Sequence, residues 1–290
     1  MKRTGLWSAT CLLLSLSLTQ IVVGQAVNTN QNTARSLRLA ALRYYDDREF
    51  GKAVRALEQA VSLRPDYAEA YNDLGLNYAA LGRHQEAIAS LQEAIRCKPG
   101  FAIAYDNLGV EYYVLGETNL AVQTLQQATK FDSENAVAFN NLGASLSDAG
   151  RSREAIEAYE RAIDLKPEWA EAHRNLALAS AQGDDYDRVF KHLNIAISLR
   201  PDYFEAYNNL GVAHYRKGHY REALEALQQA IKLKPNYDDA LYNLGLMQVA
   251  AHKRREALEQ YQKLKVLNPG LAETLYGGIY RGMILNLRNK

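Results

Sequence analysis

One stretch decides the fold of this chain. Residues 68–101 read AEAYNDLGLNYAALGRHQEAIASLQEAIRCKPGF, and the same residue types return every 34 positions on both sides of it. The proline near its end, Pro99, has counterparts on the same period at Pro65, Pro167, Pro201, Pro235 and Pro269, and Ser133 occupies the one position that lacks it. A period this regular predicts a repeat architecture in which each repeat packs against its neighbours.

A Leu-Gly pair follows the same period. Its copies are Leu74-Gly75, Leu108-Gly109, Leu142-Gly143, Leu210-Gly211 and Leu244-Gly245, with Leu176-Ala177 as a relaxed copy. A small residue then recurs in the second half of each repeat: Ala53, Ala87, Ala121, Ala155, Val189, Ala223 and Ala257. Glycine lets a neighbouring helix approach closely, and proline ends a helix. Each repeat is therefore predicted to be two antiparallel helices.

The combination of an aromatic residue, Leu-Gly, Tyr, two alanines and proline at 34-residue spacing resembles the tetratricopeptide repeat. Seven such repeats, ending at Leu271, begin at Ala34, Ala68, Ala102, Ala136, Ala170, Phe204 and Asp238. The resemblance implies an all-α fold, a right-handed α-solenoid (superhelix) of helix-turn-helix repeats. It is specific for the fold but weak for the function, because this fold is a platform for many partners.

The sequence predicts four segments. They are a signal peptide or membrane anchor over residues 1–24, a polar linker over 25–33, the seven repeats over 34–271, and a C-terminal capping helix over 272–290. A lone repeat is too short to bury enough apolar surface to offset its chain entropy, so stability must come from stacking. The final helix is expected to cover the exposed end of the stack, because its apolar residues fall near one face.

The amino terminus has the pattern of an export signal. Lys2 and Arg3 precede an apolar stretch over residues 6–23, and small residues follow it. An uncleaved anchor is the alternative, because about 18 apolar residues is the lower limit for a membrane span. A lipid-modified Cys11 fits less well, because little of the apolar segment precedes it. We expect an exported protein of the bacterial periplasm or the extracellular space.

The charge of the chain gives no reason to expect nucleic acid as a partner. The formal net charge is +1, and it becomes −1 if residues 1–24, which carry Lys2 and Arg3, are removed. A nearly neutral chain is not drawn to nucleic acid or to anionic membranes. We expect membrane association only if the amino-terminal segment stays uncleaved. Cys97 would be the one cysteine left, so no internal disulfide is expected.

No motif in the chain indicates catalysis. The six histidines show no metal-ligand spacing, and there is no glycine-rich phosphate loop. Carboxylates that recur on the repeat period are explained by solvation or by pairing with nearby arginines. We therefore expect no enzyme activity, no cofactor, no metal and no small-molecule substrate, and a protein or peptide as the partner.

One recurring polar series does not fit a solvated outer face. It stands just before the Leu-Gly pair, and we call it the asparagine ladder: Asp73, Asn107, Asn141, Asn175, Asn209 and Asn243. The resemblance implies that first helices line the concave wall, and a carboxamide both donates and accepts hydrogen bonds, so it suits an extended peptide. The ladder is similar to that of the repeat domain of O-linked N-acetylglucosamine transferases, but no catalytic domain follows. The asparagines could equally support the fold through bonds between helices.

An apolar series, the apolar lane, lies three positions further along each first helix. Its members are Leu42, Leu76, Val110, Ala144, Leu178, Val212 and Leu246. The predicted peptide-binding groove consists of the ladder with Leu76, Val110, Leu178, Val212 and Leu246. Charged residues on the same wall alternate in sign and favour no one ligand charge: Arg38, Asp106, Arg174, Glu205 and Arg216.

The fifth repeat is the most divergent internal copy. It has His173 at the aromatic position, with Ala177, Ser180 and Val189 at other consensus positions. Either a local packing change or a specialised contact explains this divergence. Two functions follow from the sequence: an exported, non-enzymatic scaffold that binds a peptide or extended segment in the groove, or a structural assembly factor of a cell-envelope complex, a pilus or secretion machine, acting through its convex face or ends.

Overall fold

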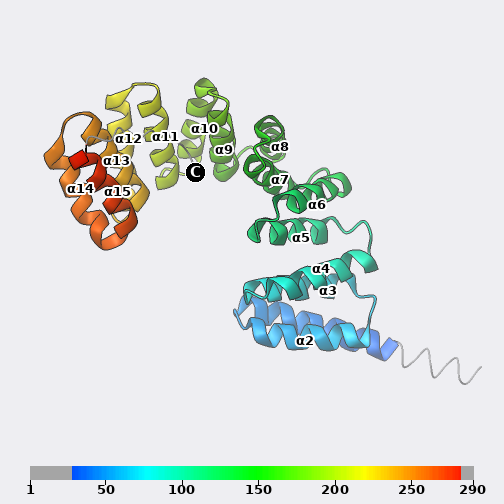
Figure 1. Ribbon diagram of the computed structural model, residues 1–290. Coiled ribbons are helices and arrows are strands. Elements are labelled where there is room, and N and C mark those ends of the chain that lie inside the picture. The colour runs from blue at the N-terminus through cyan, green and yellow to red at the C-terminus, as the bar shows by residue number, and fades with distance from the viewer. Residues whose placement is uncertain (1–27, 282–290) are drawn as a thin grey trace, which may run out of the picture. The chain divides into compact units, whose positions relative to one another are not determined.

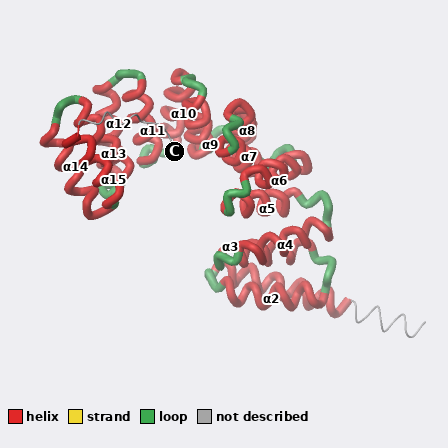
Figure 2. Tube along the Cα trace, viewed as in Figure 1, coloured by secondary structure: helices red, strands yellow, loops and turns green. Residues whose placement is uncertain are grey.

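The computed structural model describes residues 28–281. The expected signal peptide or anchor over residues 1–24 therefore lies outside the described residues, as does the end of the expected capping helix. Every regular element in the described part is a helix (Figure 2). None of these helices combines the length and the apolar character that crossing a membrane requires.

The chain divides into two compact units between Glu134 and Asn135. The first unit contains a helix over residues 28–46, then α2 (Phe50–Leu63), α3 (Ala68–Ala80), α4 (His84–Cys97), α5 (Ala102–Val114) and α6 (Thr118–Phe131). The second unit contains α7 (Ala136–Asp148), α8 (Ser152–Leu165), α9 (Ala170–Gln182), α10 (Tyr186–Leu199), α11 (Phe204–Arg216), α12 (Tyr220–Leu233), α13 (Asp238–Ala250), α14 (Arg254–Leu267) and α15 (Pro269–Arg281), as labelled in Figure 1.

The helices follow the predicted repeats. The odd-numbered helices from α3 to α13 begin at the six residues predicted to start repeats two to seven, and we call them first helices. The even-numbered helices from α2 to α14 are the second helices. Each first helix packs most extensively against the second helix of its own repeat. The fold is thus the all-α stack of helix pairs that the period predicts.

The first helices form the inner layer of each unit. In the first unit α3 contacts α5, and in the second unit α9 contacts both α7 and α11, while α11 also contacts α13. Among the described helices, no second helix contacts another second helix. Because one layer is closer packed than the other, each stack curves with its first helices on the inside.

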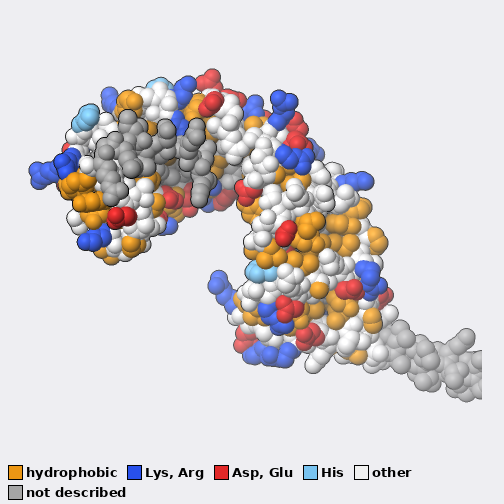
Figure 3. Space-filling view, viewed as in Figure 1, with side chains coloured by type: hydrophobic (Ala, Val, Ile, Leu, Met, Phe, Trp, Pro, Cys, Tyr) orange, Lys and Arg blue, Asp and Glu red, His pale blue; other side chains and the backbone are white. Residues whose placement is uncertain are grey.

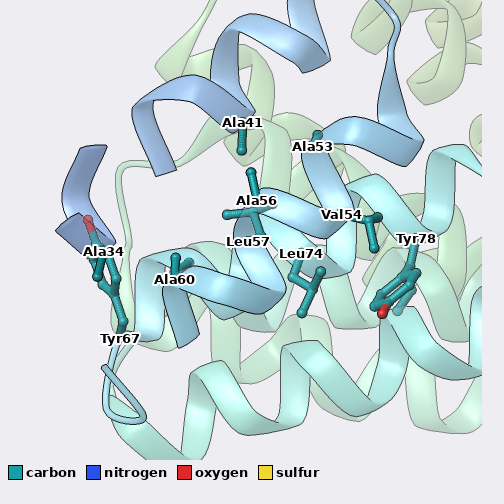
Figure 4. Packing of buried hydrophobic residues seen from close by; sticks show 12 residues of the cluster. Ala34, Ala41, Ala53, Val54, Ala56, Leu57, Ala60, Tyr67, Leu74 and Tyr78 are labelled. Atoms are coloured by element: carbon teal, nitrogen blue, oxygen red, sulfur yellow. The ribbon is translucent and has the colours of Figure 1, made fainter. Parts of the chain in front are cut away.

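Small residues allow the helices of a repeat to pack closely. In the first unit Leu57, Leu74 and several alanines fill the space between the helix over residues 28–46, α2 and α3 (Figure 4). A Cβ atom at Gly75 would lie 2.6 Å from Cγ of Leu91 and 3.2 Å from the backbone oxygen of Ala87. Gly75 therefore leaves the room that the close contact between α3 and α4 needs.

The repeat that lacks the proline still ends its second helix at the usual position. Helix α6 ends two residues before Ser133, as α4 ends two residues before Pro99. Asp132 accepts a hydrogen bond from the backbone N–H of Glu134 at 3.1 Å. Asn135 then caps α7 by accepting hydrogen bonds from two N–H groups of its first turn. Turn and capping side chains therefore replace the proline, as the sequence predicts.

The prediction of a polar linker over residues 25–33 is partly wrong, because residues 28–33 are helical. They continue into the first helix of the first repeat, where Ala34 is fully buried. The hydroxyl groups of Thr33 and Ser36 donate to backbone oxygens one turn earlier. A polar composition at this position therefore marks an exposed helix surface.

The capping helix begins earlier than expected, at Pro269 instead of residue 272. The side chain of Asn268 accepts a hydrogen bond from the backbone N–H of Leu271 at 3.2 Å, and proline is favoured in the first turn of a helix. Helix α15 packs on α13 and α14. A Cβ atom at Gly245 would lie 2.5 Å from a methyl carbon of Leu275, so α15 lies directly against the last repeat.

Candidate functional site

Three ladder asparagines join neighbouring repeats. In each case the ladder Nδ2 donates to Oδ1 of an asparagine 35 positions earlier, one position before the ladder of the preceding repeat. The bonds run from Asn107 to Asn72 (2.8 Å), from Asn175 to Asn140 (3.0 Å) and from Asn243 to Asn208 (2.9 Å). We call each such pair of positions a rung. These three rungs support the stack of first helices.

A charged pair forms the first rung of the first unit. Nε of Arg38 donates to Oδ2 of Asp73 at 2.5 Å, and Asp73 is buried. Burial raises the pKa of the Asp73 carboxyl, and the opposing effect of Arg38 does not fully cancel it. Burial would lower the pKa of Arg38, but the bond to Asp73 outweighs this and raises it. Arg38 therefore satisfies the ladder carboxylate, which is closed to a ligand in this state.

The equivalent rung of the second unit is open. It consists of Arg174 and Asn209, 136 positions after Arg38 and Asp73. The buried Nδ2 of Asn209 and the buried Nε of Arg174 have no hydrogen-bond partner. Arg174 forms no ion pair within the described chain, and its one polar contact is 3.5 Å long, from Nη1 to Oδ1 of Asn175. Two buried donors at this rung thus lack an acceptor.

The closed rungs use only part of each ladder amide. Each donates one N–H, while Oδ1 of Asn107 and of Asn243 accepts no hydrogen bond from any described residue. Asn141 is half-buried on α7 and also takes part in a polar interaction. The ladder therefore has a role in the fold, and several of its members keep hydrogen-bonding capacity for a ligand.

The apolar lane lies beside the ladder at varying depth. Leu178 is 40% exposed, while Leu76, Val110, Val212 and Leu246 are half-buried. In the second unit, Val212, Asn243 and Leu246 line one small pocket together with Tyr215, Leu227 and Met247. The structure thus brings three predicted groove residues together.

The first unit also exposes apolar side chains on α5 and α6. Hydrophobic side chains gather over α5 and α6 (Figure 3). Two of the exposed residues are on α5: Ile103 at its start and Val114 at its end, which is 56% exposed. An apolar surface of this kind suits a partner with apolar side chains.

Two histidines of the fifth repeat bond to each other. Nε2 of His173 lies 3.0 Å from the backbone oxygen of Pro167, so this nitrogen carries the proton. Nδ1 of His173 must then accept the hydrogen bond from Nδ1 of His192, at 2.9 Å. Burial, followed by the electrostatic effect of the neighbouring His173, lowers the pKa of His192 to about 4. His192 is therefore neutral at neutral pH, and its bond to His173 joins α9 to α10.

The described residues show no group of three or more His, Cys, Asp or Glu side chains placed to hold a metal ion. Cys97 is free and half-buried, and burial raises the pKa of its thiol. A raised pKa makes a thiol a poor nucleophile at neutral pH.

The sequence patterns did not identify the residues that complete the rungs. Asn72, Asn140 and Asn208 occur in alternate repeats, one position before the ladder. The sequence patterns likewise did not show that Arg38 and Arg174 have different partners. Once the structure gives the offset of 35 positions, the sequence pairs Arg38 with an acid and Arg174 with an amide.

Family models match most of the repeat region. Models described as "Tetratricopeptide repeat" match residues 38–100, 102–135, 136–168 and 204–237, and one described as "TPR repeat" matches residues 185–218. Together they span more than half of the chain. Comparison with curated proteins finds no match.

Solved structures show the same fold. A tetratricopeptide repeat protein from Parabacteroides merdae is 17% identical, with a TM-score of 0.68 over 86% of this chain and 99% of that one. PilF of Pseudomonas aeruginosa is 24% identical, with a TM-score of 0.63 over 74% and 98%. YrrB, described as a TPR protein with an unusual peptide-binding site, is 23% identical, with a TM-score of 0.56 over 65% and 97%.

Repeat length, helix bounds and inner layer of first helices agree with these matches. TPR proteins are in general scaffolds for protein–protein interaction and not catalysts. The chain belongs to the tetratricopeptide repeat family.

Proposed function

We propose that this chain is an exported, non-enzymatic scaffold that holds an extended segment of a partner protein along its first-helix face. The observation that carries this proposal is the unused hydrogen-bonding capacity of the ladder beside the apolar lane. Oδ1 of Asn107 and of Asn243 and Nδ2 of Asn209 have no partner in the described chain. Leu178, in the lane, is 40% exposed.

An extended peptide fits such a surface for a physical reason. Its backbone presents N–H and C=O groups that amide side chains can satisfy whatever the peptide sequence, and the lane can bury apolar side chains of the peptide. YrrB, of the same fold, is described as having an unusual peptide-binding site. That description supports a peptide as the class of ligand to test first.

The test must separate binding from stability, because the ladder also joins the repeats. One variant replaces Asn107, Asn175 and Asn243 with Ala. The matched control replaces their acceptors, Asn72, Asn140 and Asn208, with Ala and loses the same three bonds. We expect both variants to melt at similarly lowered temperatures, while only the ladder variant loses capture of partners from an envelope extract. Equal capture by both folded variants would refute the ladder as the binding element.

The export part of the proposal rests on the basic start and the apolar stretch of residues 1–24. Mass spectrometry of the mature protein tests it directly. We expect a new first residue after Gly24 or Ala26, and an envelope or extracellular location. Recovery of the intact chain from the cytosol would contradict export, and an intact chain in the membrane fraction would support the anchor.

A second function, assembly of an envelope complex through the second helices, has its own observation. An open pocket of about 690 Å³ lies between α12 and the α13–α14 hairpin. Its lining includes Gln228, Gln248 and Tyr220, and Tyr220 is 63% exposed. This surface would suit a partner that docks on the second-helix side of the second unit.

A further inference from the structure

The open rung has an internal reference in the same chain. At the equivalent rung of the first unit, Arg38 is paired with the carboxylate of Asp73. In the second unit Asn209 occupies the position equivalent to Asp73, so the repeat period pairs Arg174 with an amide that carries no charge. One carboxylate present in the first unit is therefore missing from the second.

We propose that the rung of Arg174 and Asn209 binds an acidic side chain, Asp or Glu, within the extended segment of the partner. This inference rests on the proposed function and states the chemistry of its ligand. A carboxylate has two oxygens that accept hydrogen bonds, and the rung offers two buried donors without partners, Nε of Arg174 and Nδ2 of Asn209. Hydrogen bonds between a guanidinium and a carboxylate are among the strongest in proteins.

Acids lie near Arg174, but none in the described chain forms an ion pair with it. Arg174 acts electrostatically on the phenols of Tyr203 and Tyr237, so both rings lie near it. Glu205 acts on both phenols, and Asp239 acts on Tyr237, to which it also hydrogen-bonds, but neither acid forms an ion pair with Arg174. Glu171, the other acid near Tyr203, is already paired with Arg200. Turning the Asn209 amide over would offer Arg174 a carbonyl oxygen but no negative charge.

The position of the rung indicates that the bound carboxylate belongs to a side chain of the partner and not to its carboxy terminus. Closed rungs lie on both sides of it in the second unit, from Asn175 to Asn140 and from Asn243 to Asn208. The exposed Leu178 lies one turn beyond Arg174 on the same helix. A segment that follows the ladder therefore continues past the rung in both directions, and its acidic residue is internal.

The proposal can be tested with a variant that supplies the missing carboxylate from the chain itself. Asn209→Asp supplies the missing carboxylate and reproduces the pair formed by Arg38 and Asp73. A display library of random twelve-residue peptides is selected on the full-length wild type and on N209D. The best peptide is then synthesised with Asp or Asn at its acidic position, and with a free or an amidated carboxy terminus. The dissociation constant of each form is measured.

We expect wild-type peptides to contain Asp or Glu, and the Asn form to bind about tenfold or more weakly. Amidation of the carboxy terminus should leave the dissociation constant unchanged. N209D should melt at a higher temperature than the wild type and bind both forms alike. Arg174→Gln provides a second test of the same preference and should also abolish it.

The failures are distinguishable. Peptides selected without an acidic residue, or an acidic preference that survives in both N209D and R174Q, would overturn the inference and leave the proposed function intact. If the acidic preference depended on the free carboxy terminus, the rung would bind a chain end, and the claim that it binds an internal Asp or Glu would be wrong. A library that enriches no peptide would overturn the proposed function and this inference with it.

Discussion

The second repeat, α3 and α4, and the fifth repeat, α9 and α10, build the same helix pair from different side chains. The second repeat places Gly75 against Leu91. The fifth has Ala177 at the equivalent position, and both Ala177 and the opposing Leu193 are still fully or almost fully buried. A methyl group is thus accommodated in one repeat at a position where the other leaves no room for it.

The polar contacts of the two repeats also differ. The hydroxyl of Tyr78 donates to Glu58 at 2.8 Å, and burial together with this bond raises the pKa of Tyr78 to about 12. At the equivalent position of the fifth repeat, the hydroxyl of Ser180 donates to the backbone oxygen of Leu176, in its own helix. The second repeat therefore bonds to its neighbour where the fifth bonds within itself.

The comparison separates two kinds of divergence. His173, which replaces the aromatic consensus residue, is compensated by its bond to His192. Arg174, the next residue, has no partner of opposite charge. The fifth repeat is therefore both a packing variant and the place where a polar group is left open. The second of these features is the one that points to a ligand.

The largest effect on stability is expected from a substitution at Gly75. In Gly75→Val, Cβ itself would lie 2.6 Å from Leu91, and the branched side chain would crowd α4 further. We expect destabilisation by about 3 kcal/mol, whereas Ala177→Gly should lose only about 1 kcal/mol, from helix propensity. Urea unfolding followed by hydrogen exchange of the two repeats checks this. Similar small losses for both variants would show that the two helix pairs are not packed differently.

The histidine pair should make the fifth repeat sensitive to acid. The folded pKa of His192 is about 4, below its ordinary 6.5, and nearby Lys191 and Arg188 act in the same direction. Below about pH 6.5 the unfolded chain binds a proton that the folded chain does not, so stability falls until the pH reaches about 4. For a half-buried ring we expect a loss of about 1 to 2 kcal/mol.

Hydrogen exchange of α9 and α10 between pH 7 and pH 4.5 measures this loss. His192→Phe should remove most of the pH dependence, because the titrating ring is gone. An unchanged pH profile in that variant would assign the acid sensitivity to other groups.

Opening the closed rung should have a smaller effect. Asp73→Asn leaves Arg38 facing an amide, as Arg174 does in the native second unit. We expect a loss of about 1 kcal/mol, because Arg38 is only partly buried and water can solvate part of it. Thermal melting gives the measurement. A rise in melting temperature would mean that the burial of Asp73 outweighs its pairing with Arg38.

The smallest effect is expected at the turn between the two helices. Gly82 has φ of 72°, and the equivalent residue of the fifth repeat, Asp184, has φ of 58°. Glycine adopts this left-handed conformation without strain, so Asp184→Gly should stabilise the fifth repeat by about 0.5 to 1 kcal/mol. Gly82→Asp is the reverse control in the second repeat. No change in either variant would show that the turn carries no strain.

The sequence could predict most of the fold, because each repeat carries its own boundary residues. Helix starts at Ala68 and its equivalents follow from the proline, alanine and glycine positions. The end of the chain departed from this pattern. Pro269 has the spacing of a turn proline, but Asn268 caps the helix immediately before it, so α15 starts at the proline. Local capping chemistry there overrides the period.

The site was harder to predict than the fold. The period identified the ladder, but a partner 35 positions away follows from the way first helices cross, which one sequence does not give. The charges of Arg38 and Arg174 looked alike in the sequence, and only their partners distinguish them. The hydrogen-bonding state of a side chain is a property of the folded neighbourhood.

The central claim is that the first-helix face, and not the second-helix face, holds the partner. Site-specific photo-cross-linking from position 178 and from position 228 tests it most directly, because Leu178 is in the lane on α9 and Gln228 lines the pocket beside α12. We predict partner adducts from position 178 and none from position 228. Adducts from position 228 with none from position 178 would contradict the groove and favour assembly through the second helices.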